Sequence, residues 1–275
     1  MTFGLDVLSA IGVLVIVVLG LAVVLGVLDV INLAHTGFMA VGVYTAVTVT
    51  HHGLPFWAGL LGAVLVSAVV GLAVELLVIR RLYARPLETI LATWGLSLVI
   101  IQVLTLAYGH NNQALGQPVD GSVAGYPSYR LLIVLIGAVL VAALAVLLRY
   151  TRAGLTIRMV QSNDQLARGL GIRVAFIRGT TFVVGCALAG FAGALLGPTQ
   201  AINPNYAVSL VAAAFLAVLM AGRRLSGLVL ACVLLAAVQV LFGRLFNPVY
   251  SSTAMIAVAV VALRIRPEGL TWQRA

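Results

Sequence analysis

The side chains that could bind a small solute begin with the stretch LDVINLAHTGF, which interrupts a long apolar run. Asp29, Asn32, His35 and Thr36 supply carboxylate, amide, imidazole and hydroxyl groups there. This interruption predicts a broken helix near residues 29–37, because non-helical backbone is tolerated at membrane depth only where protein or water satisfies its polar groups. A half-helix beginning near Thr36 would point its positive end at a polar solute. An ordinary cytoplasmic turn capped by Asn32 explains the same spacing equally well.

A second group of candidate solute-binding side chains lies in the segment ARPLETILATWGLSLVIIQ, at Thr93, Trp94, Ser97 and Gln102. Thr93, Ser97 and Gln102 are spaced roughly as one face of a helix, so they could line a pathway. They could equally bond neighbouring helices, which is the commoner role of Ser and Thr in membranes. Both groups together favour an uncharged or zwitterionic solute, since Asp29 is the main candidate for a charge inside the membrane.

Enzymatic chemistry is not expected, because no cluster of His, Asp, Glu, Ser or Cys shows catalytic spacing. All sixteen basic residues are arginine, and without lysine the chain has neither a P-loop lysine nor a Schiff-base nucleophile. Any ATP that drives the protein must therefore be hydrolysed by another chain. No metal site is expected either, since the adjacent His51 and His52 have no further ligand at suitable spacing. Cys186 and Cys232 lie in apolar segments and are interpreted as packing residues.

The composition excludes a soluble globular domain. Hydrophobic residues make up 63% of the 275 residues and charged residues 8%, and the mean hydropathy is +1.17. Too few polar side chains remain to cover a water-exposed surface, so an all-α, polytopic helical membrane protein surrounded by lipid is predicted. The net charge of +9 does not indicate a nucleic-acid partner, because the arginines cluster where membrane topology explains them.

The apolar runs predict about nine transmembrane segments, several of them shorter than the ~20 residues that a bilayer requires. The runs cover approximately residues 8–28, 36–51, 56–79, 90–108, 131–148, 178–197, 207–222, 226–243 and 251–263.

The distribution of arginine predicts which side of the membrane each loop occupies. With the N-terminus outside and the C-terminus cytoplasmic, only Arg130 and Arg244 fall on the outer side before the final residues of the chain. Glu75 lies one turn before Arg80 and Arg81, so we expect it to be neutralised at the inner membrane edge; a proton-relay role is the less favoured alternative.

Residues 149–178 form the longest polar interruption and carry six of the sixteen arginines, so they are predicted to be cytoplasmic. Ser162 followed by Gln165 matches a capping box that starts a helix, and Gly169 or Gly171 supplies its stop. The apolar face of this helix is expected to consist of Leu166, Ala167 and Leu170. Such a short helix is not stable alone. It either rests on its own helical bundle or docks into a soluble partner.

Small residues four apart recur in the run GCALAGFAGALLG, as in Cys186/Gly190, Ala189/Gly193 and Gly193/Gly197. This pattern lets helix backbones approach closely. The span is therefore predicted to be an internal packing axis, or alternatively a subunit interface. The expected packing residues are Gly185, Gly190, Gly193 and Gly197.

Taken together, these segments resemble a known family. GVLDVINLAHTGFMAVGVYTA is similar to the GVINLAHG-type segment of the branched-chain amino acid permeases of ABC importers, the H-type half of that heterodimer. The stretch from Thr151 to Ile172 resembles the coupling-helix motif of that family, and ALAGFAGALLGP and RPEGL follow at the expected places. RPLETILATWGLSL, followed by the short GHNN loop, is more similar to the urea-transporting branch.

The resemblance implies a single permease domain over residues 1–275 in a bacterial cytoplasmic membrane. Its implied partners are a homologous second permease chain, two cytoplasmic ATPases and an extracytoplasmic solute-binding protein. No cofactor is expected on this chain, since ATP and Mg would be bound by the ATPases. In that picture the helix from Asn163 to Leu170 sits in a cleft of one ATPase. The implied coupling residues are Arg158, Gln161, Asn163, Asp164, Leu166, Ala167, Leu170 and Gly171.

The function expected from these observations is ATP-driven import of a small polar solute. Urea or a short amide is favoured, with branched-chain amino acids a close second. The alternative is a passive channel or ion-coupled carrier that works alone, which would leave the docking-type helix unexplained.

Overall fold

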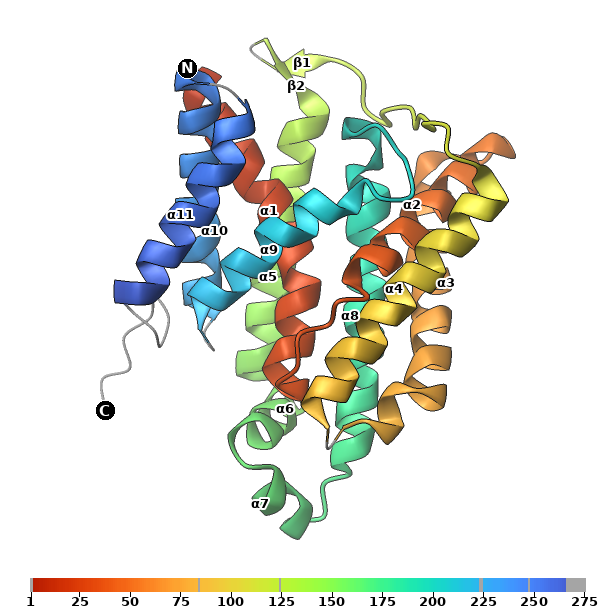
Figure 1. Ribbon diagram of the computed structural model, residues 1–275, viewed down its shortest axis with the longest axis vertical. Helices are drawn as coiled ribbons and strands as arrows, with labels where there is room; N and C mark the ends of the chain where they lie inside the picture. The colour runs from red at the N-terminus through yellow and green to blue at the C-terminus, as the bar shows by residue number, and fades with distance from the viewer. Residues whose placement is uncertain (1, 84, 124, 223–224, 247, 266–275) are drawn as a thin grey trace. The chain divides into compact units, whose positions relative to one another are not determined.

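The computed structural model describes residues 2–83, 85–123, 125–222, 225–246 and 248–265 (Figure 1). The main helices are α1 Thr2–Leu28, α2 His35–His51, α3 Phe56–Leu77, α4 Pro86–Tyr108, α5 Ser128–Tyr150, α6 Arg152–Ser162, α7 Asp164–Gly169, α8 Val174–Leu196, α9 Ala207–Ala221, α10 Leu225–Leu245 and α11 Pro248–Ile265. Two 3₁₀ turns, η1 Ile79–Arg81 and η2 Gly197–Thr199, follow α3 and α8. The RPEGL tail and the Arg223/Arg224 pair lie outside the described residues.

Every predicted apolar run corresponds to a helix in the part of the chain that the structure describes. Six of these helices, α1, α3, α4, α5, α8 and α10, are long and apolar enough to cross a membrane. Helices α2, α9 and α11 are shorter, with 17, 15 and 18 residues. Among the described residues, the other regular structure is one hairpin of β1 Ser122–Val123 and β2 Tyr126–Pro127 and an isolated bridge between Gln113 and Ile202. The count of about nine crossings and the sidedness of the termini remain predictions.

The chain divides into two compact units. The first comprises Met1–Val18, Val119–Val141 and Ser209–Ala275. Within it α10 packs against α11, and the beginning of α1 lies close to α5, since a Cβ added to Gly12 would come within 2.9 Å of the Cα of Val134. An ion pair of 3.3 Å joins Arg244 of α10 to Asp6 of α1.

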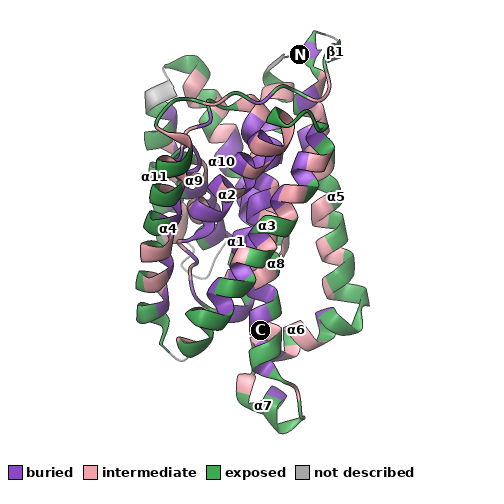
Figure 2. Ribbon diagram, turned by 90° about the vertical axis from the view of Figure 1, so that its right-hand side faces the viewer, coloured by how far each residue is buried: buried purple, intermediate pink, exposed green. Residues whose placement is uncertain are grey.

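The second unit comprises Leu19–Pro118 and Ala142–Val208 and has α2, α3 and α8 at its centre. Helix α2 is buried on nearly all sides, as its colouring in Figure 2 shows. Glycines make this packing possible: a Cβ added to Gly42 of α2 would overlap the backbone of Gly190 on α8, and one added to Gly71 of α3 would lie 2.7 Å from the Cβ of Cys186. Helix α4 packs against α2 as well.

The four glycines predicted to pack lie on different sides of α8 or directly after it. A Cβ at Gly185 would meet Val24 of α1, and one at Gly190 would meet Ser67 of α3. A Cβ at Gly193 would overlap the carbonyl of Met39 on α2. One at Gly197 would lie 2.8 Å from Val43. Each glycine therefore removes a side chain where another helix passes.

The polar stretch 149–178 contains two helices where the sequence predicted one. Thr151 caps α6 by accepting a hydrogen bond from the N–H of Gly154 at 3.0 Å. Ser162, predicted to cap the second helix, is instead the last residue of α6. The cap of α7 is Asn163, whose extended backbone lets its side-chain oxygen accept from the N–H of Leu166 at 2.9 Å. Gly171, with φ +80°, follows the end of α7.

The predicted apolar face of α7 was wrong in one residue. Leu166 and Leu170 are 59% and 61% exposed, whereas Ala167 is 1% exposed. Helix α7 packs against α6 and α8, and the N–H of Ile172 donates to the Ala167 carbonyl at 3.0 Å just after the helix ends. The exposed apolar surface of α7 is therefore formed by the two leucines.

Candidate solute-binding site

The predicted break between two helices is present. Helix α1 ends at Leu28, Asp29 adopts a left-handed backbone conformation with φ +57°, and α2 begins at His35. For a residue other than glycine such a conformation is uncommon and turns the chain sharply. The non-helical segment 29–34 therefore separates two helices that a continuous apolar run would have joined.

The backbone of this segment is held by protein groups. The N–H of Leu33 donates to Oγ1 of Thr93 at 3.2 Å, and the N–H of Ala34 donates to Oδ1 of Asn32 at 3.1 Å. Asn32 therefore holds the turn before α2, but the N-cap of that helix is Ala34, which has no side-chain cap bond. Whether the break lies at membrane depth or in a cytoplasmic turn stays a prediction.

Helix α4 supplies a stripe of buried hydroxyls beside the break. Thr89, Thr93 and Ser97 are 3%, 1% and 4% exposed, and their spacing of four residues places them on one face. The hydroxyls of Ser97 and Thr36 lie 2.7 Å apart. Gly37 permits this approach, since a Cβ there would lie 3.3 Å from the Cα of Ser97.

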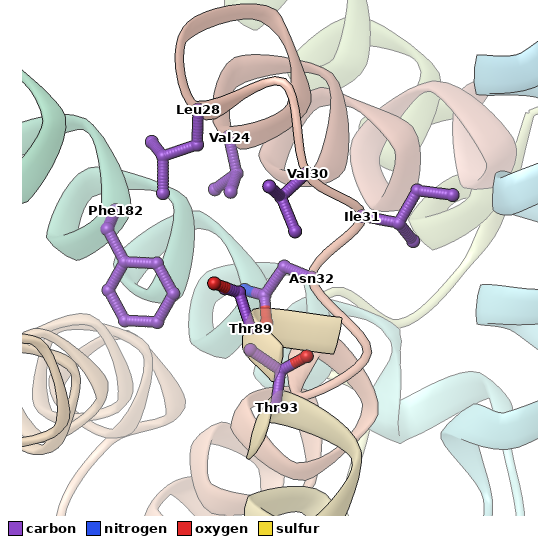
Figure 3. Close-up of a pocket in the computed structure, with 8 residues that line it drawn as sticks. All are labelled: Val24, Leu28, Val30, Ile31, Asn32, Thr89, Thr93 and Phe182. Atoms are coloured by element: carbon purple, nitrogen blue, oxygen red, sulfur yellow. The ribbon is translucent and has the colours of Figure 1, made fainter. Parts of the chain in front are cut away.

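A shallow recess, too narrow in this conformation to hold a water molecule, lies between α1, the break, α4 and α8 (Figure 3). We call it the Asn32 recess. Its lining comprises Val24, Leu28, Val30, Ile31, Asn32, Thr89, Thr93 and Phe182. Figure 3 shows the side chains of Asn32, Thr89 and Thr93 gathered on one side, with Val24, Leu28 and Phe182 around them. The recess thus combines a polar corner with an aliphatic and aromatic wall.

The amide of Asn32 has bonding capacity to spare. The residue is 3% exposed, its Oδ1 is used by Ala34, and its Nδ2 has no hydrogen-bond partner among the described residues. Leaving a buried donor without a partner costs about 1–3 kcal/mol. By contrast, the hydroxyl of Thr89 already donates to the Leu82 and Arg85 carbonyls and that of Thr93 to the Ile90 carbonyl. Asn32 is therefore the donor available to a solute.

The remaining predicted solute-binding residues lie elsewhere. Asp29 is exposed. His35 is fully buried and packs beside Gly20 of α1. Trp94 is 54% exposed, and Gln102 is exposed as well, so both point away from the hydroxyl stripe of α4. The structure brings Asn32 and Thr93 to the recess and places Thr36 and Ser97 next to it.

Thr89, Phe182 and the aliphatic residues of the recess were not predicted from the sequence. A signal for Thr89 existed, because Thr89, Thr93 and Ser97 follow one another at intervals of four residues. Gln102, five residues after Ser97, breaks that interval and faces outward. Nothing in the local sequence distinguishes Phe182 from the other apolar residues of α8.

Within the described residues, no three His, Cys, Asp or Glu side chains are grouped closely enough to hold a metal ion. The recess itself presents one hydrogen-bond donor without a partner, on Asn32, beside an aliphatic and aromatic wall.

Comparison with known proteins points to a transport family. Residues 4–263 match the family described as branched-chain amino acid transport system permease component. The chain is 24% identical to the high-affinity branched-chain amino acid transport system permease protein LivH of Escherichia coli K12, over 93% of this chain and 90% of that protein. It is 26% identical to the probable branched-chain amino acid transport permease protein LivH of Methanocaldococcus jannaschii, over 94% and 88%.

A second type of permease is also similar. The chain is 29% identical to the high-affinity branched-chain amino acid transport system permease protein LivM of Salmonella typhimurium, over 93% of this chain and 67% of that protein. Among solved structures, a chain of PsaBC from Streptococcus pneumoniae in complex with Fab shares the fold, with a TM-score of 0.53 at 14% identity, over 98% of this chain and 93% of that one.

Proposed function

Because this chain belongs to the family of branched-chain amino acid transport system permease components, we propose that residues 1–275 serve as one permease domain of an ATP-driven importer, with the Asn32 recess on its solute pathway. A permease component is not an enzyme, in agreement with the lack of any lysine for a P-loop. Energy must then come from separate ATPase chains.

The observation that supports the proposal is the Nδ2 of Asn32, which has no hydrogen-bond partner among the described residues and belongs to a recess lined mainly by apolar side chains. A carboxylate or carbonyl oxygen of a solute would satisfy it. The break in the backbone is the other requirement, since it exposes polar groups at a depth where continuous helices hide them.

The solute that the lining of the recess favours is an amino acid with a branched aliphatic side chain, and the recess must widen to admit it. Five of the eight lining residues, Val24, Leu28, Val30, Ile31 and Phe182, are aliphatic or aromatic, and such a wall favours an aliphatic group over urea. The relatives named above support the same solute. The urea preference suggested by RPLETILATWGLSL has no support in this lining, and urea becomes the comparison solute.

The proposed assembly includes a homologous second permease chain, two cytoplasmic ATPases and an extracytoplasmic binding protein, in a bacterial cytoplasmic membrane. The similarity of the chain to both LivH and LivM supports pairing of related permeases. We assign the ATPase contact to α7, because Leu166 and Leu170 expose apolar surface at the end of the second unit (Figure 1). Asn163 caps this helix and Asp164 is its first residue. Gly171, with a positive φ, follows the end of the helix.

The other predicted coupling residues lie in α6. Arg158 is exposed. Gln161 is half-buried beside α1, since a Cβ added to Gly26 would lie 3.0 Å from its Nε2. Gln161 therefore faces its own helices, and only Arg158 of this pair is accessible to a partner.

The deciding experiment is uptake into vesicles that contain the complete complex, with leucine and urea offered separately. ATP-dependent leucine uptake that exceeds urea uptake supports the proposal. Urea uptake exceeding leucine uptake would overturn the solute assignment. Equal flux with and without ATP, from this chain alone, would instead establish the passive carrier.

A further inference from the structure

Glu75 of α3 is a buried carboxylate outside the solute recess. It is 4% exposed, and it fits against α8 only because position 179 is glycine, where an added Cβ would lie 2.7 Å from Oε1 of Glu75. The expected neutralisation of Glu75 at the inner membrane edge stays a prediction, and the neighbouring Arg80 and Arg81 are exposed. Oε1 of Glu75 accepts a hydrogen bond from the hydroxyl of Tyr83 at 2.7 Å.

Tyr83 connects this carboxylate to an arginine. Burial, and then the hydrogen bond to Glu75, raise the pKa of the Tyr83 hydroxyl well above its ordinary value, so the hydroxyl remains a donor. The guanidinium carbon of Arg178 lies 5.7 Å from the centre of the Tyr83 ring. This distance is typical of a cation–π contact.

Arg178, in the second turn of α8, continues the connection to α7. Its Nη2 lies 3.3 Å from Oδ2 of Asp164, with side-chain exposures of 18% and 29%. Asp164 is the first residue of α7, and its Oδ2 also pairs with Arg168 at 2.8 Å. A partly buried ion pair is screened less by salt than an exposed one.

We infer that Arg178 is a positioning residue that joins α7 to α3 and α8 through Asp164 on one side and the Tyr83–Glu75 pair on the other. The helix has only six residues, which is too short to hold its orientation unaided. A displacement of α7 would therefore shift Arg178 and, through its contacts, the helices α3 and α8. This inference rests on the proposed contact of α7 with an ATPase.

The test measures solute transported per ATP hydrolysed by the complete complex in vesicles. Arg178→Gln is expected to lower this ratio at least about fivefold, the lower end of ordinary coupling between sites, while ATP hydrolysis persists. Arg178→Lys, which keeps the charge toward Asp164, is expected to recover part of the ratio. Arg173→Gln is the matched control, since this arginine is exposed, and it should leave the ratio unchanged.

A double-mutant cycle separates positioning from an independent role of either residue. Asp164→Asn and Asp164→Asn/Arg178→Gln are compared with Arg178→Gln. If the double variant transports as much solute per ATP as the single variants, the result supports the connection. If the losses of the single variants multiply in the double variant, or if no variant changes the ratio, the connection is overturned. If Arg178→Gln does not assemble, a ratio for Asp164→Asn equal to that of the wild type overturns the inference, and a reduced ratio supports it. Failure of the wild-type complex to couple ATP to uptake would count against the proposed function instead.

Discussion

The hydroxyls of Thr36 and Ser97 lie 2.7 Å apart and join the first turn of α2 to the middle of α4. Together with the bond from the Leu33 N–H to Thr93, this contact fixes the non-helical segment against one helix. The position of Asn32 is consequently set by α4. Variants of these α4 residues should therefore disturb the break more than the rest of the fold.

Thr93→Val should destabilise the protein, because the substitution removes the acceptor of the Leu33 N–H. An unsatisfied buried donor costs about 1–3 kcal/mol, measurable as a lower unfolding temperature in detergent. Thr93→Ser keeps the hydroxyl and should retain most of the stability. Thr105→Val is the control on the same helix, since that hydroxyl bonds the Ile101 carbonyl one turn earlier. A similar loss in both Val variants would contradict the role of Thr93.

Asn32→Asp should impair leucine uptake without preventing assembly. The variant keeps an acceptor for the Ala34 N–H but removes the donor that faces the recess. Losing a hydrogen bond to a charged group costs about 1.5–3 kcal/mol, roughly 10- to 150-fold in apparent affinity. The measurement is the leucine concentration that gives half-maximal uptake. An unchanged value would remove the Asn32 recess from the pathway.

Gly193→Ala should severely reduce the yield of folded protein. The added methyl would overlap the Met39 carbonyl on α2, and overpacking of this kind costs about 1–3 kcal/mol or more. Gly95→Ala is the matched control, since nothing lies within 4 Å of its added Cβ on α4. That variant should be neutral or stabilise by roughly 0.5–1 kcal/mol, as expected for glycine replaced in a helix. Size-exclusion profiles and unfolding temperatures compare the two.

Leu166→Asp should weaken binding of the ATPases while the chain still inserts and folds. Leu166 is 59% exposed, so a charge there meets water in the free permease, whereas in the proposed complex it would meet an apolar cleft of the ATPase. Co-purification of the ATPases measures the effect, with exposed Gln165→Glu on the same helix as control. Ala167 is unsuitable for this test, because its burial makes any large replacement a stability variant. Full ATPase binding by Leu166→Asp would place the contact elsewhere.

The helices were predictable because apolar length alone identifies them, and the break was predictable because Asn32 and His35 interrupt an apolar run. The direction of individual side chains was not. Thr89, Thr93 and Ser97 lie four residues apart and therefore on the face of α4 that α2 covers. Trp94 and Gln102 do not belong to this series, so they point outward. Ser162 and Asn163 are both good cap residues, and the extended backbone at Asn163 decided between them.

Long-range packing determined the remaining differences. Ala167 is buried in a short helix that packs against α6 and α8. Glu75 meets Tyr83 because Gly179 leaves space on a helix a hundred residues away in the chain. Neither relationship has a local signal, since both depend on which helices become neighbours.

The enclosure of α2 bears on how the protein is made. Gly42 lies against Gly190, so a wall of the site that α2 occupies is synthesised 148 residues later. During translation α2 therefore lacks its neighbour α8, and other surroundings, such as the membrane insertion machinery, must accommodate it until α8 has been synthesised. Ribosome pausing or truncation before α8 would leave an early helix without its final neighbours and expose the nascent chain to membrane proteases.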